Sequence, residues 1–259
     1  RAESVAGYVA QPTAMGLVWR GRANVYQRHD QFELSLQATQ KATSIFQEHG
    51  SSLDVAKTRT LEVYTLGVLG KFEEAILLAR WIQRQFRGFP LGQAHLAANL
   101  AQVYTWNWQL EQALRYYRKA HQLYMQEDLS DLAAEMLFNM GVACDYLDQF
   151  SRAERYYKSA FQALQGKAPI INIKILHNLA LLSYRQAKYE QALSRIEQAH
   201  QLQAQIGATA DAAYLDLYEG RIRRVLHQFE QAEQLLRNAL AGFGQPGFLA
   251  ELAETKIEL

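Results

Sequence analysis

Three asparagines recur at one register of this 259-residue sequence, and their side chains could hydrogen-bond a bound polypeptide. Asn99, Asn139 and Asn178 lie 40 and 39 residues apart, and each opens a stretch that ends on an alanine 21 residues later. A side-chain amide has both a donor and an acceptor, so it can pair with either backbone group of an extended peptide. Each such bond would contribute about 1 kcal/mol net, with specificity left to the neighbouring side chains. The same amides could instead bond only to a neighbouring helix, and the sequence leaves both roles open.

Residues suited to catalysis or metal binding do not converge in the sequence. The seven histidines are dispersed, with no His-Glu-x-x-His or similar metal-binding spacing. Cys144 is the single cysteine, which excludes an intramolecular disulfide and a cysteine-based metal site, and its register predicts a buried, inert thiol. No nucleophile, base and oxyanion donor come together. We therefore predict a chain with no catalytic residue, no metal and no cofactor.

Composition and charge narrow the class of partner. Lys and Arg total 27 against 26 Asp and Glu, so the formal charge is +1. No net field draws such a chain to nucleic acid or to an anionic membrane, and no apolar run approaches the roughly 18–20 residues that a membrane span needs. We expect a protein or peptide partner, no direct nucleic-acid partner and no membrane. A lone cysteine suits a cytoplasmic location, and the oligomeric state stays open.

One motif occurs six times along the chain. It consists of an aromatic residue or Leu, a small residue three positions later and, in five of the six copies, an Ala seven positions after that. The small residues are Ser35, Ala75, Ala113, Ala153, Ala192 and Ala232, which are separated by 40, 38, 40, 39 and 40 residues. A period held this closely over six copies indicates a repeat architecture.

Each repeat has the pattern of two amphipathic helices. In the fourth, apolar residues recur at three-to-four spacing over residues 132–147 and again over 150–164. We expect Gly166 and Pro169 to end that second helix, and Gly70 to form the turn of the second repeat. Small residues seven positions apart let two helices approach closely, and stacked pairs bury a core that one pair cannot bury alone. No segment reads as a strand, so the sequence predicts an all-α fold.

These features resemble the tetratricopeptide-repeat family. In residues 93–128 the matching residues are Leu100, Ala101, Tyr104, Ala113, Tyr117 and Ala120, and in 133–168 they are Gly141, Phe150, Ala153, Tyr157 and Ala160. The period of about 40 residues exceeds the family's usual 34 or so and is similar to its long-period branch. The second repeat departs from the pattern, with Arg59, Glu62 and Val63 where Trp, Leu and Gly are usual. The resemblance implies a right-handed superhelical solenoid of antiparallel helix pairs.

The predicted organisation is a single array over residues 1–259. Its repeats cover residues 13–54, 55–92, 93–130, 131–170, 171–209 and 210–248. Residues 1–12 read as the end of a preceding repeat, and residues 249–259 as the start of a further one. We therefore expect the chain to be the repeat region of a longer protein.

The resemblance also implies where a partner binds. In the family, the first helix of each repeat lines a concave groove, and Asn at the register of Asn99 contacts the peptide in related peptide-binding members. Alignment places in this groove His95, Asn99, Gln102, Trp106, Phe138, Asn139, Tyr146, Lys174, His177, Asn178, Tyr184, Arg185, Arg221 and Arg224, with Lys57 and Tyr64 at equivalent positions.

Two groups within this set carry further expectations. The basic residues Lys174, His177, Arg185, Arg221 and Arg224 would suit an acidic segment of a partner, or form a solvated face paired with nearby acids. Of Trp106 and Trp108, which flank Asn107, we expect one to pack between repeats and leave open whether the other is an anchor in the groove.

The function that these patterns favour is a non-catalytic protein-interaction scaffold that binds a peptide segment or a neighbouring domain. The resemblance leaves two alternatives: an effector-binding sensor domain of a bacterial signalling or transcription regulator, and a regulatory array in a larger protein with a caspase-like peptidase domain. A sensor predicts an enclosed pocket, whereas a scaffold predicts an open groove. Fold alone does not choose among them.

Overall fold

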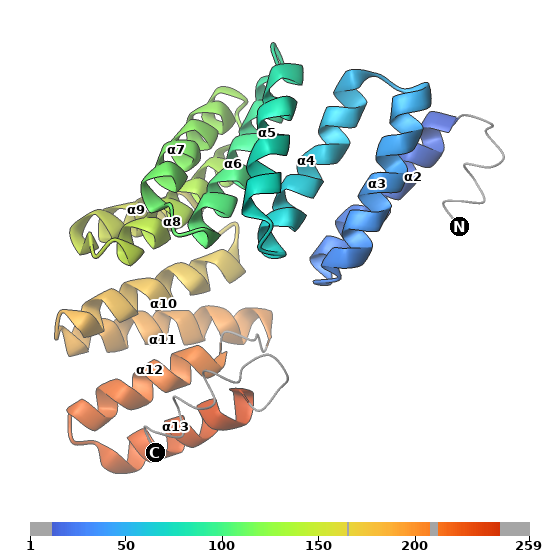
Figure 1. Ribbon diagram of the computed structural model, residues 1–259. Helices are drawn as coiled ribbons and strands as arrows, with labels where there is room; N and C mark the ends of the chain where they lie inside the picture. Colours follow the sequence, from blue (N-terminus) through green and yellow to red (C-terminus); the bar gives the residue numbers. More distant parts are fainter. Residues whose placement is uncertain (1–11, 165, 208–211, 244–259) are drawn as a thin grey trace. The chain divides into compact units, whose positions relative to one another are not determined.

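The computed structural model describes residues 12–164, 166–207 and 212–243, and every regular element in these residues is a helix (Figure 1). The helices are α2 (Pro12–Arg28), α3 (Phe32–His49), α4 (Ser52–Val68), α5 (Phe72–Gln85), α6 (Pro90–Trp106), α7 (Leu110–Gln126), α8 (Ser130–Tyr146), α9 (Phe150–Leu164), α10 (Pro169–Arg185), α11 (Tyr189–Ile206), α12 (Ala212–Val225) and α13 (Phe229–Phe243). Successive helices pack as pairs, for example α2 with α3 and α12 with α13. The predicted all-α fold is confirmed.

The chain divides into two compact units, Arg1–Asp148 and Gln149–Leu259. The described part of the first unit contains α2 to α8, and that of the second contains α9 to α13. The division falls inside the predicted repeat 131–170, and the predicted repeat boundaries stay a prediction. Of the two predicted partial repeats at the ends, residues 1–11 and 249–259 lie outside the described residues.

The repeated motif sets where the second helix of each pair begins. These helices begin at the first residue of each motif copy: Phe32, Phe72, Leu110, Phe150, Tyr189 and Phe229. The small residue three positions later is buried in every copy, and so is the residue seven positions after that. Ala113 and Ala120 are both 0% exposed, as are Ala153 and Ala160. The prediction that small side chains lie in the helix–helix contacts is therefore confirmed.

The turn inside each pair also repeats, and it requires a left-handed backbone. Two positions before each motif copy, the residues Asp30, Gly70, Trp108, Asp148, Ala187 and His227 have φ between 55° and 73°. Gly70 has the largest of these angles, 73°, and confirms the expected glycine turn. The same backbone is disfavoured for a bulky side chain such as Trp108.

Local signals explain several helix starts. The Ser51 hydroxyl accepts a hydrogen bond from the backbone N–H of Asp54, and the Asp54 carboxylate accepts one from the backbone N–H of Ser51, which forms a capping box for α4. Pro90 and Pro169 occupy the first turns of α6 and α10, where a missing N–H costs nothing. Pro169 therefore begins a helix instead of ending one, and α9 already ends at Leu164.

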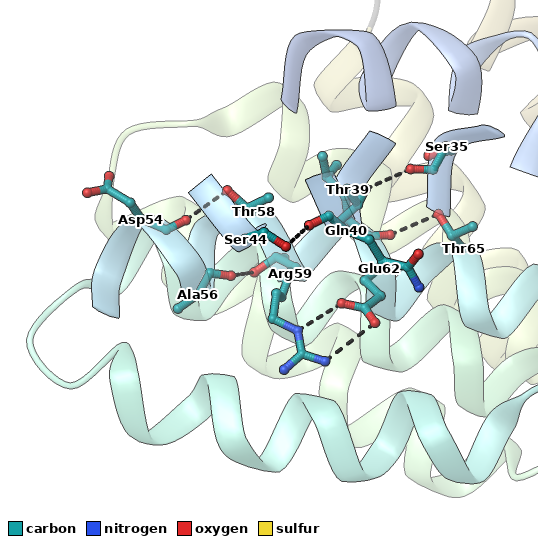
Figure 2. Close-up of polar contacts among 12 residues, drawn as sticks. Ser35, Thr39, Gln40, Ser44, Asp54, Ala56, Thr58, Arg59, Glu62 and Thr65 are labelled. Atoms are coloured by element: carbon teal, nitrogen blue, oxygen red, sulfur yellow. Dashed lines mark hydrogen bonds and ion pairs between the residues drawn. The ribbon is translucent and has the colours of Figure 1, made fainter. Parts of the chain in front are cut away.

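The helix that departs most from the expected pattern, α4, is held by polar contacts (Figure 2). Arg59 Nε donates to Glu62 Oε2 across 2.8 Å, and the Arg59 guanidinium lies 5.6 Å from the centre of the Trp81 ring on α5. The buried Thr58 hydroxyl donates to the Asp54 carbonyl oxygen at 2.8 Å. A half-buried ion pair thus stands where the family usually has apolar side chains, and its charges are paired.

Candidate functional site

A groove in the first unit brings together polar and apolar side chains from consecutive repeats. It has a volume of about 470 Å³ and is partly open to solvent. We call it the α2–α4–α6 groove, and its lining residues are Arg20, Asn24, Gln27, Lys57, Thr60, Leu61, Phe86, Phe89, Leu91, Gly92, His95 and Asn99.

The groove follows from the repeat register. Arg20, Thr60 and Asn99 are 40 and 39 residues apart, so they occupy equivalent positions on α2, α4 and α6. Since α4 contacts both α2 and α6, equivalent side chains lie on neighbouring helices of one wall. Residues at three- or four-residue spacing share a helix face, which adds Asn24 and His95 to the same wall.

Three amides in the groove donate to the protein itself. Asn99 Nδ2 donates to the Thr60 carbonyl oxygen at 2.9 Å, which joins α6 to α4. Gln27 Nε2 donates to Thr65 Oγ1 at 3.2 Å, which joins α2 to α4, and Asn24 Nδ2 donates to the Arg20 carbonyl oxygen at 3.2 Å. No described residue donates to the amide oxygens of these three side chains. Their acceptor groups therefore remain for a ligand.

Two cations give the groove a positive potential. Lys57 Nζ lies 4.7 Å from the centre of the Phe89 ring, and the Arg20 guanidinium lies 5.8 Å from that of Phe46. None of the described residues that line the groove carries a carboxylate. The pKa of nearby Asp54 is lowered, chiefly by the hydrogen bond from Ser51 and less by the charges of Lys57 and Arg20.

His95 adds a neutral hydrogen-bonding group. Its Nδ1 lies 2.8 Å from the Tyr124 hydroxyl oxygen, and partial burial lowers the pKa of His95. The ring is therefore uncharged near neutral pH, and it still has an exposed surface.

The floor of the groove is apolar. The rings of Phe86 and Phe89 meet edge to face with centres 5.6 Å apart. A Cβ atom at Gly92 would lie 2.3 Å from Phe89 Cδ1, so this position requires a glycine if the Phe89 ring is to stay where it is.

Only some of the sequence-predicted residues of the first unit line the groove. His95 and Asn99 line the groove, together with Lys57. Gln102 instead accepts a hydrogen bond from the buried Tyr117 hydroxyl at 2.9 Å, and Trp106 packs against Tyr64 between α4 and α6 with ring centres 5.2 Å apart. The other three are Phe138 and Asn139, which are half-buried on α8, and Tyr146, which is exposed.

The predicted basic cluster of the second unit is only partly at the surface. Lys174, Arg185 and Arg224 are exposed. The guanidinium of the buried Arg221 lies 5.2 Å from the centre of the Tyr218 ring, and the His177 ring lies 5.1 Å from the same ring. Burial lowers the pKa of His177 to about 4, so this ring is neutral at physiological pH.

The remaining predicted residues of the second unit are Asn178 and Tyr184. Asn178 is half-buried on α10, and Tyr184 packs near Tyr189 with ring centres 6.1 Å apart. Because Asn178 belongs to the second unit and Asn99 to the first, the row of three asparagines stays a prediction.

Of the residues that line the groove, only Lys57, His95 and Asn99 were sequence candidates; the others include Arg20 and Phe89. Counting back one period from Thr60 leads to Arg20, so the repeat register contains a signal for the residues of α2. Phe86 and Phe89 follow α5 outside any repeated helix position, and only the packed structure places them.

Metal-binding clusters and membrane-spanning helices are absent from the described residues. No group of three or more His, Cys, Asp or Glu side chains in the described part could hold a metal ion. No described helix is long and apolar enough to cross a membrane. Cys144 is buried, as predicted, and its predicted inertness stays a prediction.

Comparison with known proteins gives the family of these repeats. Residues 92–166 match the sequence model of the tetratricopeptide repeat. These residues are tetratricopeptide repeats. The matched segment extends from α6 to Gly166, beyond the end of α9, so this tetratricopeptide segment includes the predicted family positions Ala113, Ala120, Ala153 and Ala160. No curated protein matches the chain in sequence.

Solved structures share the fold of this chain at low sequence identity. The apo form of the quorum sensor NprR from B. thuringiensis is 15% identical with a TM-score of 0.77, covering 98% of this chain and 73% of that one. A Rap protein in complex with competence and sporulation factor is 14% identical with a TM-score of 0.70, covering 95% and 74%. Aspartyl phosphate phosphatase F from Bacillus subtilis is 13% identical with a TM-score of 0.66, covering 94% and 75%. These similarities concern the fold, and the predicted absence of catalysis stays a prediction.

Proposed function

We propose that this tetratricopeptide protein is a protein-interaction scaffold and that the α2–α4–α6 groove binds an extended segment of a partner protein. The observation that carries the proposal is the composition of the groove: amide acceptors and two cations stand around an apolar floor in about 470 Å³. Tetratricopeptide folds support interaction scaffolds, and the Rap neighbour was solved in complex with a factor.

The groove chemistry specifies the kind of segment. Amide oxygens of Asn24, Gln27 and Asn99 can accept from backbone N–H groups of a bound chain. Arg20 and Lys57 favour a carboxylate, since no described lining residue is acidic. Phe86, Phe89 and Leu61 accommodate an apolar side chain. We therefore expect a segment with an acidic residue next to an apolar one.

The test is a selection of random peptides on the full chain, followed by affinity measurements on variants. Asn24 is exposed and bonds only to the Arg20 carbonyl within its own helix, so Asn24→Trp fills the groove with little effect on folding. Asn238→Trp places the same side chain at an exposed position of α13 and serves as the matched control.

Selected peptides should bind the wild type and Asn238→Trp equally and should lose at least about tenfold in affinity for Asn24→Trp. They should also be enriched in Asp and Glu. Peptides that bind all three proteins equally would show that the groove is not the binding site.

A second candidate is the recognition of a small effector. The groove volume of about 470 Å³ lies within the roughly 300–1,000 Å³ typical of ligand pockets, and one structural neighbour is a quorum sensor. An effector would raise the melting temperature of the wild type by mass action. The increase should be absent in Asn24→Trp and present in Asn238→Trp. A sensor would be expected to have an enclosed pocket, so the partly open groove favours a peptide over a small effector.

A further inference from the structure

Two exposed aromatic side chains meet in the first unit outside the α2–α4–α6 groove. Trp108 is 71% exposed and Tyr146 is 53% exposed. Their ring centres are 5.4 Å apart, with the planes inclined at 47°. Trp108 lies in the turn after α6 and Tyr146 is the last residue of α8, so two repeats contribute one ring each. A pair of this kind differs from the single apolar side chains scattered over an ordinary surface.

The turn register at Trp108 does not require an aromatic side chain. Its φ is 55°, at the turn register that Asp30 and Asp148 occupy with nearly the same angle. Asp tolerates this left-handed region far better than a bulky aromatic residue does. Because most of the Trp108 ring is exposed, the burial of its apolar surface does little to offset the cost of this backbone conformation. A residue held in a disfavoured conformation without a packing reason indicates a functional role.

The surroundings of the two rings favour a cation. Neither α6 nor α8 has a basic residue in its last turn, so the partial negative charge of both helix ends lacks a cation of the same helix. No Lys, Arg or His occurs in residues 96–114 or 132–148. Glu111 and Asp148 in the same two stretches are exposed. The faces of aromatic rings add a negative potential of their own.

We propose that Trp108 and Tyr146 form a docking point for an arginine or lysine side chain of a partner protein. A cation within about 6 Å of the centre of an aromatic ring is attracted by the ring quadrupole, and a guanidinium group also stacks on the ring. The docking point is independent of the α2–α4–α6 groove, whose cations suit the opposite charge. The two surfaces would bind different parts of a partner.

The test measures the binding of a fluorescently labelled hexa-arginine peptide to the full chain, with hexaglutamate as the probe of opposite charge. Trp108→Asn removes the ring and introduces a residue that tolerates the left-handed backbone. Tyr146→Ala removes the second ring. Phe229→Ala removes another exposed aromatic side chain, in the second unit, and is the matched control. Circular dichroism verifies that each variant is folded.

Hexa-arginine should bind the wild type and Phe229→Ala with the same Kd. The Kd should rise about twofold to fivefold in Trp108→Asn and in Tyr146→Ala, and hexaglutamate should not bind at this point. The inference is overturned if Trp108→Asn binds hexa-arginine as tightly as the wild type, or if the wild type does not bind it at millimolar concentration. Asn24→Trp should leave this binding unchanged, so failure here and failure of the groove proposal are distinguishable.

Discussion

The side-chain amide of Asn99 donates a hydrogen bond to the backbone carbonyl oxygen of Thr60 across 2.9 Å and so joins α6 to α4. Asn139 and Asn178 share the register of Asn99, yet the side chain of neither forms a hydrogen bond with another described residue. Asn99 thus supports helix packing with its N–H while its oxygen remains for a ligand. The structural role of Asn99 is therefore observed, its role in peptide binding stays a proposal, and the three asparagines are not equivalent.

Replacement of Asn99 should therefore reduce stability where replacement of its counterparts does not. Asn99→Ala should lower the free energy of unfolding by about 1 kcal/mol, the net contribution of one hydrogen bond. Asn139→Ala and Asn178→Ala, the matched controls, should change it by less than about 0.5 kcal/mol. Urea unfolding of the three variants measures these differences. Equal losses for all three would contradict the structural role of Asn99.

The buried Arg195 of α11 should be a main determinant of stability in the second unit. Its guanidinium donates to the Leu179 carbonyl oxygen, to the Ser183 hydroxyl and to Glu154 Oε1, and so joins α9, α10 and α11. Arg195→Met should cost about 2 kcal/mol, because the Ser183 and Glu154 contacts lose their buried donor.

Arg237 provides the control for Arg195, since it forms an exposed ion pair with Glu233 on α13. Arg237→Met should cost less than about 0.5 kcal/mol. Both values come from urea unfolding at pH 7. A cost for Arg195→Met no larger than that for Arg237→Met would show that the buried contacts do not stabilise the unit.

The half-buried His177 should make stability depend on pH. Its pKa is lowered from 6.5 to about 4 by burial, so the unfolded chain binds the proton before the folded chain does. The free energy of unfolding therefore falls as pH drops from 6.5 to 4, by about 2 kcal/mol between pH 7 and 4.5, and this effect is absent above pH 6.5. His177→Phe should remove this part of the acid sensitivity.

The measurement compares the free energy of unfolding at pH 7 and at pH 4.5 for the wild type, His177→Phe and the exposed-site control His29→Gln. The control should keep the acid sensitivity of the wild type. If His177→Phe is as acid-sensitive as the wild type, the ring is not held neutral in the folded state.

The helix pairs were predictable because their determinants are local and periodic. The motif residues Phe32 and Phe229 begin their helices as the spacing indicates, and the small residues that follow are buried. Pro169 was assigned to the wrong helix, since a proline is compatible both with the region after one helix and with the first turn of the next.

The candidate site was predictable only in part, because a register specifies a helix face and not the path of a side chain. The position of Arg221 in its repeat predicts that it lines the concave groove, yet Arg221 is buried and its guanidinium lies over the ring of Tyr218. Trp106 and Trp108 are two residues apart, and only three-dimensional packing shows that the first is half-buried against Tyr64 and the second is exposed.

The cations of the α2–α4–α6 groove are central to the proposed function. Their contribution to the affinity for a selected acidic peptide tests that function most directly. Isothermal titration compares the wild type with two double variants. The groove variant carries Arg20→Gln together with Lys57→Gln. The charge-matched control carries Lys71→Gln together with Arg84→Gln, at exposed positions outside the groove. We predict that the groove variant loses at least about tenfold in affinity and depends less on salt, while the control binds like the wild type. Equal affinity of the groove variant and the wild type would contradict the proposal that this groove binds the partner.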